Sequence, residues 1–134
     1  MLLLTILLFG RSADAADQPG IFPFGNDEAP AQFLKQVQAA VSSDDKERVA
    51  DFVKFPVLVR LRGRSVQIAR RTFLARYNEI FTTDVKSALL SAKFESRSRY
   101  DGVWWNWQGM MVGHGEVWFA GYGDGSIKIM TINN

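Results

Sequence analysis

The chain has 134 residues, which is enough for one domain, and 47% of them are hydrophobic, so it can bury a core and is not expected to be disordered. Its 16 basic and 14 acidic residues give a net charge of +2, which is too nearly balanced to indicate a nucleic-acid-binding protein. The absence of cysteine excludes disulfides, thiolate zinc sites and cysteine nucleophiles.

The N-terminus predicts an export signal. Leu2 to Phe9 is an apolar run too short to span a bilayer, and Ala13-Asp14-Ala15 fits the small-x-small pattern that signal peptidase reads. We therefore expect residues 1–16 to be a signal peptide and residues 17–134 to be a single domain, periplasmic or secreted. The alternative is a buried strand, because no Lys or Arg precedes the apolar run. No second hydrophobic segment follows, so the mature form is expected to have no membrane span.

Two helices are predicted after a Pro- and Gly-rich arm at Gln18–Pro30. The first carries an apolar stripe at helical spacing, made of Phe33, Leu34, Val37, Ala40 and Val41. The second has Asp44 as its N-cap and Glu47 as the capping-box partner. Pro56 ends this helix because it forces Phe55 into an extended conformation.

A hairpin and two further helices are predicted next. Apolar residues alternate with polar ones at Val57, Val59 and Leu61, and Gly63 follows as the turn. The helical spacing then returns at Phe73, Leu74, Tyr77, Ile80 and Phe81. Another short helix begins at Thr83 or Asp84.

From Lys93 onward the pattern is typical of strands. One strand is predicted over residues 94–100, and further strands follow in residues 103–133, with a turn at Gly121–Gly125. Helices followed by strands predict an α+β protein: a curved antiparallel sheet with the N-terminal helices packed on its concave face.

This order resembles the nuclear transport factor 2-like fold, the cone-shaped α+β barrel shared with SnoaL-type and ketosteroid-isomerase-type proteins. Small exported bacterial members have a segment similar to FPVLVRLRGRSVQIARRTFLARYNEIF, then a glycine-spaced strand similar to GMMVGHGEVWF and a closing strand similar to SIKIMTIN. The resemblance covers roughly residues 28 to 134. The superfamily includes isomerases, dehydratases, binding domains and dimerisation domains, so the resemblance implies the fold and a homodimer but assigns no catalytic residue.

His114, the only histidine, is the first candidate site residue. On a strand it would share a face with Met110, Val112, Glu116 and Trp118. His114 and Glu116 would then form a proton-relay pair beside an aromatic wall. The alternative is a structural pair, with Glu116 in a salt bridge to Lys128 or to an arginine of the hairpin. One histidine and one carboxylate are too few for a metal site, so neither a metal nor a cofactor is predicted.

Trp104, Trp105 and Trp107 form the most unusual local composition. On a strand Trp105 and Trp107 share one face and Trp104 points to the other, so one face could be exposed. Exposed tryptophans stack on sugars or anchor protein interfaces. The alternative is that all three line the core or an internal pocket.

Five arginines lie between Arg60 and Arg71, and Arg60 and Arg62 share one face of the predicted strand. Guanidinium groups suit carboxylates and phosphates, so anionic glycans or lipid head groups are candidate ligands. The alternative is a solvated outer face that protects a sheet edge from aggregation.

The titratable groups are too few to assign acid, base and oxyanion roles, so we favour a non-catalytic binding or interaction domain with a hydrophobic pocket. A small apolar molecule, a glycan or an envelope protein would be its partner. The predicted binding residues are Trp104, Trp105, Trp107, His114, Glu116, Trp118, Arg60 and Arg62. The alternative is an isomerase- or hydrolase-like enzyme that uses His114 and Glu116 in the pocket.

Overall fold

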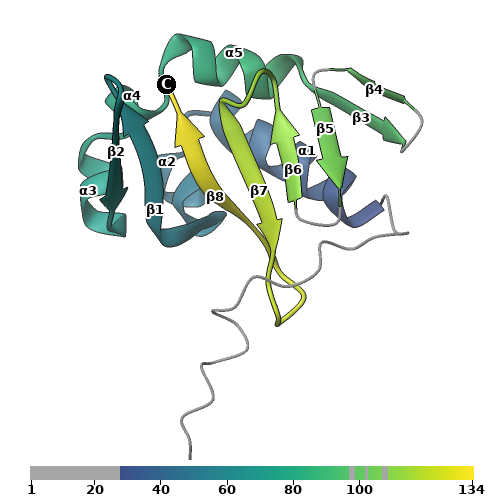
Figure 1. The fold of residues 1–134 in the computed structure, drawn as a ribbon, viewed down its shortest axis with the longest axis horizontal. Helices are drawn as coiled ribbons and strands as arrows, with labels where there is room; N and C mark the ends of the chain where they lie inside the picture. Colours follow the sequence, from purple (N-terminus) through teal and green to yellow (C-terminus); the bar gives the residue numbers. More distant parts are fainter. Residues whose placement is uncertain (1–27, 97–98, 102, 107–108) are drawn as a thin grey trace, which may run out of the picture.

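A computed structural model of the protein describes residues 28–96, 99–101, 103–106 and 109–134, and the signal peptide predicted at residues 1–16 lies outside these ranges. The described residues form an α+β fold, which confirms the predicted class (Figure 1). In chain order the elements are α1 (Glu28–Ser42), α2 (Lys46–Asp51), β1 (Val53–Leu61), β2 (Arg64–Ile68), α3 (Arg70–Ala75), α4 (Tyr77–Ile80), α5 (Thr83–Ser91), β3 (Lys93–Ser96), β4 (Arg99–Asp101), β5 (Val103–Asn106), β6 (Gly109–Val112), β7 (Val117–Gly121) and β8 (Ile127–Asn133). None of the described helices is long and apolar enough to cross a membrane.

Most of the described strands form one open sheet in the order β2-β1-β8-β7-β6-β5. β5 to β8 pair as antiparallel neighbours, as predicted. β1 and β8 run parallel, so the prediction of a wholly antiparallel sheet is wrong at this pair. A parallel pair needs a long connection, and the chain supplies one because most of the other elements lie between β1 and β8. With β2 and β5 as its edges, the sheet does not confirm the predicted cone-shaped closure.

The single strand predicted over residues 94–100 is wrong. The described part of this segment belongs to β3 and β4, which pair with each other in a separate two-stranded sheet. The alternation of polar and apolar residues therefore indicated extended backbone correctly but did not reveal the reversal of the chain.

The helices pack on one face of the large sheet. In Figure 1, α1 and α2 lie behind the sheet and α5 runs across its upper end. The predicted stripe of α1 is buried, and the ring of Phe33 meets Phe119 of β7 edge-on, with 4.9 Å between ring centroids. Val37, Phe119 and Ile129 have no exposed surface. Each such burial contributes about 1.5–3 kcal/mol, which holds the helices to this face.

Two helix boundaries differ from the prediction. Asp45, and not Asp44, caps α2: its carboxylate accepts from the backbone N–H of Arg48 at 3.2 Å, whereas Asp44 has a left-handed φ of 54°. The helix predicted across residues 73–81 is divided into α3 and α4 at Arg76, whose φ of −111° and ψ of 20° leave the helical range. α5 begins at Thr83, as predicted.

The predicted hairpin at Gly63 is confirmed. Arg62 and Gly63 form a two-residue loop between β1 and β2, with φ values of 50° and 79°. Two consecutive positive φ angles are the requirement of a type I′ hairpin turn, which explains the glycine. Because Arg62 belongs to this loop and β1 ends at Leu61, the prediction that Arg60 and Arg62 share a strand face is wrong.

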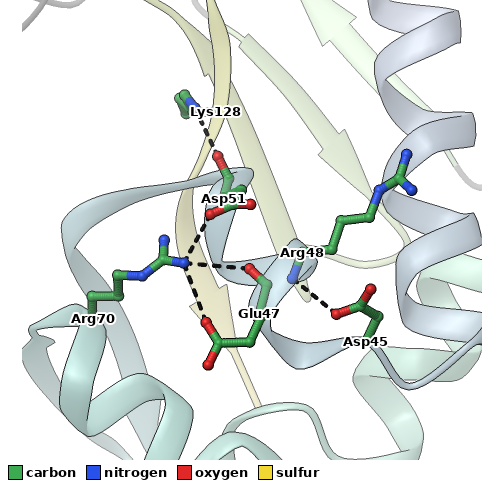
Figure 2. Close-up of polar contacts among 6 residues, drawn as sticks. All are labelled: Asp45, Glu47, Arg48, Asp51, Arg70 and Lys128. Carbon is green, nitrogen blue, oxygen red and sulfur yellow. Dashed lines mark hydrogen bonds and ion pairs between the residues drawn. The ribbon is translucent and has the colours of Figure 1, made fainter.

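An exposed polar network links α2 to α3 and β8 (Figure 2). The guanidinium of Arg70 donates to the carboxylate of Asp51 at 2.8 Å and to that of Glu47 at 3.4 Å. The ammonium of Lys128 donates to the backbone carbonyl of Asp51 at 2.7 Å. Exposed pairs of this kind contribute at most about 1 kcal/mol each, so the network orients these elements more than it stabilises them.

Tyr77 of α4 is a buried residue with an unusual hydroxyl. Its ring stacks on Phe81 with centroids 5.0 Å apart. Among the described residues, its hydroxyl oxygen is buried without a hydrogen-bond partner. Burial raises the pKa of Tyr77 to about 12, and the charges of Asp44 and Asp45 act in the same direction. In the unfolded chain a tyrosine ionises near pH 10, so the stability linked to Tyr77 is complete below pH 10 and is lost as the pH rises toward 12.

Replacing Tyr77 by phenylalanine removes the unpartnered hydroxyl and keeps the ring contacts. We expect Tyr77→Phe to raise the free energy of unfolding at pH 7 by about 1 kcal/mol, because a buried polar group without a partner is destabilising. The variant should also lose less stability than the wild type between pH 10 and 12. Urea denaturation at pH 7 and pH 11 measures both effects, and a clear loss of stability at pH 7 would contradict an unpartnered hydroxyl.

Candidate functional site

The segment that holds His114 is a turn. Residues 113–116 connect β6 to β7, so the prediction that His114 lies on a strand beside Met110 and Val112 is wrong. Gly113 and Gly115 take φ values of 68° and 109°, which glycine adopts without strain. His114 is exposed, whereas Met110 and Val112 are fully buried, so the histidine does not share a face with them.

Hydrogen bonds hold this turn in one conformation. The carboxylate of Glu116 accepts from the backbone N–H of His114 at 2.6 Å. The side-chain amide of Asn133, at the end of β8, donates to the carbonyl of Gly115 at 2.6 Å. The backbone N–H of Asn133 donates to the carbonyl of Glu116 at 2.8 Å. The turn is thus fixed both from within and from the neighbouring strand.

Asn134 connects the same end of the sheet to β1 and α4. Its backbone N–H donates to the carbonyl of Arg60 at 3.3 Å, and its side-chain amide donates to the carbonyl of Glu79 at 3.0 Å. In Figure 1 the C-terminal end, the β6–β7 turn and α5 lie together at one end of the sheet. Five separate parts of the chain therefore meet there: the C-terminal end, β1, α4, the β6–β7 turn and α5.

A pocket of about 490 Å³ lies at this end of the sheet. It is lined by Arg60, Asp84, Met111, His114, Gly115, Glu116, Trp118, Asn133 and Asn134. We call it the rim pocket. Four of the predicted binding residues line it: Arg60, His114, Glu116 and Trp118.

Trp118 and Met111 give the rim pocket an apolar surface. They are cross-strand partners on β7 and β6, and both are half-buried. A Cβ placed on Gly115 would lie 3.6 Å from the indole nitrogen of Trp118 and 3.7 Å from the sulfur of Met111, so both side chains pack against the turn. Trp118 thus lies among polar groups that come from β1, α5, the β6–β7 turn and the end of β8.

His114 and Glu116 are close together but do not form a relay. The Nδ1 of His114 is 4.0 Å from Oε1 of Glu116, which is too long for a hydrogen bond, and the imidazole is fully exposed. The other carboxylate oxygen of Glu116, Oε2, accepts the hydrogen bond from the backbone N–H of His114. The alternative in which Glu116 forms a salt bridge with Lys128 or a hairpin arginine is not seen among the described residues, where the Lys128 ammonium donates to the carbonyl of Asp51.

The other predicted binding residues lie elsewhere. Arg62 lines a second pocket, of about 390 Å³, with Leu61, Arg76, Glu79, Thr82 and Asn134. On β5 the backbone of Trp104 pairs with Met111 and that of Trp105 with Met110. Trp104 is therefore the cross-strand neighbour, on β5, of Met111, which lines the rim pocket. Trp107 lies outside the described residues.

Asp84, Asn133 and Asn134 were missed as site residues. Asp84 was considered only as a helix start, and it reaches the rim pocket from the first turn of α5. The two asparagines follow the apolar strand SIKIMTI directly, and this abrupt change to polar residues was the available signal. The described residues contain no group of three or more His, Cys, Asp or Glu side chains placed to hold a metal ion.

No family model matches the chain, and comparison with curated proteins and with solved structures gives no match either. The resemblance to nuclear transport factor 2-like proteins therefore stays a prediction. The function has to be argued from the pocket and the surface.

Gly113 is the residue on which the shape of the turn depends. A Cβ there would overlap the carboxylate of Glu116 and lie 2.9 Å from the Cβ of Ala88 on α5. We expect Gly113→Ala to lower the free energy of unfolding by about 1–3 kcal/mol, because it adds backbone strain and crowding.

Gly125→Ala is the matched control. Gly125 has a φ of 84° but nothing within 4 Å of its would-be Cβ, so this variant suffers backbone strain alone. Thermal or urea denaturation of both variants gives the comparison. If Gly113→Ala is no more destabilising than Gly125→Ala, the contact between the turn, Glu116 and α5 has no energetic weight.

Proposed function

We propose that this protein is a small exported, non-catalytic binding domain whose ligand site is the rim pocket. The observation that carries the proposal is the convergence of Arg60, Trp118 and Asn133, from three separate strands, on one pocket of about 490 Å³. Pockets of this size, with an aromatic surface and a few fixed polar groups, are typical of small-molecule sites. The predicted signal peptide supports a periplasmic or secreted location.

A glycan is the ligand class that best fits the lining. Trp118 supplies a partly exposed aromatic ring for stacking, and the pocket adds a guanidinium, two carboxylates and two side-chain amides. These groups donate and accept hydrogen bonds in several directions, as the hydroxyl groups of a sugar require. An entirely apolar molecule would remove the charged and polar groups of the pocket from water without offering them any hydrogen bond, which disfavours it.

We also propose that the fold is a nuclear transport factor 2-like fold. The order of elements supports this, with two helices, a hairpin, three short helices and then a run of strands, as does the placement of α1 and α2 on one face of the sheet. A curved, cone-shaped closure and a homodimer are further parts of the same proposal.

An isomerase- or hydrolase-like enzyme is the second candidate, because His114 and Glu116 line the same pocket. Two observations weigh against it. Glu116 already accepts a hydrogen bond from the backbone of the turn, and the Nδ1 of the exposed imidazole lies 4.0 Å from its carboxylate, beyond hydrogen-bonding distance. Binding needs neither group to move a proton, so we favour binding.

The proposal predicts that Trp118→Ala weakens saccharide binding about tenfold or more, because the stacking surface is lost. The probes are trimers of N-acetylglucosamine and of galacturonic acid, titrated against the full chain by calorimetry. Trp118→Phe keeps an aromatic ring and should lose less affinity. Met130→Ala is the control, since Met130 is exposed on β8 and does not line the rim pocket.

Two results would contradict the binding proposal. One is the absence of binding by either trimer at millimolar concentration, and the other is binding that Trp118→Ala leaves unchanged. Turnover of either trimer that is lost in both His114→Ala and Glu116→Gln would favour the enzyme instead.

A further inference from the structure

One of the two edges of the large sheet is formed by β2. This strand pairs with β1 on one side and is the first strand of the sheet order, and residues 64–67 are all exposed. Its pairing with β1 is regular over the whole strand, from Leu61 and Arg64 to Val57 and Ile68. Val66 leaves 41% of its surface exposed there. The edge strand therefore has no bulge in its pairing with β1 and is partly apolar, and both features suit the addition of another strand.

The turn geometry shows which backbone groups of β2 face outward. A two-residue hairpin loop closes on a hydrogen-bonded pair, here Leu61 and Arg64. Hydrogen-bonded and non-hydrogen-bonded pairs alternate along an antiparallel ladder. Ser65 and Gln67 belong to the non-hydrogen-bonded pairs, so their N–H and C=O groups point away from β1.

The charges beside this edge have no partners in the described structure. Arg62 and Arg64 make no ion pair with any described residue, whereas Arg70 is bonded to Asp51 and Arg76 to Glu79. Glu79 lines a pocket with Arg62, but its carboxylate lies 2.7 Å from the Arg76 guanidinium. The carboxylates of α2 and α4 are thus engaged by other arginines, and two guanidinium groups at the edge stay available.

We propose that β2 binds an extended acidic peptide segment of a partner protein as an added strand. The backbone of the segment would bond to Ser65 and Gln67, and its carboxylates would meet Arg62 and Arg64. An apolar residue two positions from an acidic one would lie on the same face of the added strand and would cover Val66. A membrane surface or a polyphosphate would use the arginines but not the outward N–H and C=O groups, which is why a peptide is favoured. This site is separate from the rim pocket.

The test uses the full chain and a fluorescent peptide that repeats Glu-Thr-Val-Thr, so that Glu and Val share one face of the added strand, with a copy in which Lys replaces each Glu. Fluorescence anisotropy should show binding of the acidic peptide with an affinity that falls as salt rises, and weak or no binding of the basic copy. Hydrogen exchange should show new protection at Ser65 and Gln67.

Two variants separate the backbone contribution from the charge contribution. Gln67→Pro removes an outward N–H without removing a bond to β1, and it should weaken binding about tenfold or more, whereas Gln67→Thr keeps the N–H and should not. Arg62→Asn combined with Arg64→Thr should weaken binding by at least the same factor. The hairpin should still fold, because Asn-Gly is a favoured type I′ loop.

The control for net charge is Lys35→Gln combined with Arg48→Gln, on α1 and α2, which removes the same charge and should leave binding unchanged. Equal loss in this control would show that binding is only non-specific attraction, and the proposal would be abandoned. It would also be abandoned if the acidic peptide does not bind while the Arg62→Asn and Arg64→Thr protein aggregates, since the arginines would then only protect the edge.

Discussion

The arrangement of this protein depends on the position of one strand: β8, the last strand, lies in the middle of the sheet between β1 and β7. Its inward residues, Ile129 and Ile132, are fully buried against the helical layer, so hydrophobic burial fixes its register. That register carries Asn133 and Asn134 to the point where β1 ends and β6 turns into β7. The hydrogen bonds of the two asparagines then join elements that are far apart in the sequence. The polar rim pocket thus depends on the burial of the apolar residues of β8.

The local parts of the fold were predictable because their signals are periodic. The stripe of α1 repeats every three to four residues, and the glycine at position 63 marks a turn that needs a positive φ. The β6–β7 turn had a signal that was harder to see. The buried residues change from even positions, Met110 and Val112, to odd positions, Val117 and Phe119, and such a change requires a break in the strand. Because Trp118 lies between Val117 and Phe119 and is also apolar, the change from even to odd positions was not evident in the sequence.

The composition of the site was only partly predictable, for a different reason. Arg60, His114, Glu116 and Trp118 are distinctive residue types, so they were predicted as site residues, the last three together and Arg60 apart from them. Nothing in their spacing shows that Arg60 lies near the turn, because that depends on the parallel pairing of β1 with β8. Likewise, the presence of Asp84 in the pocket depends on where α5 packs against the sheet. Contacts of this kind are set by tertiary packing, which a periodic pattern does not encode.

The division of the fold into two layers decides where the two proposed sites lie. The helices fill one face of the sheet with fully buried side chains, so polar groups gather at the end of the sheet and along its edge. At the end, carboxylates and a guanidinium lie around a half-buried indole, and their charges nearly balance. At the β2 edge the charge is entirely positive and the backbone is open. A concave site with mixed charges suits a compact polar molecule, whereas a basic sheet edge suits an extended anionic chain, so the two proposed sites differ in both shape and charge.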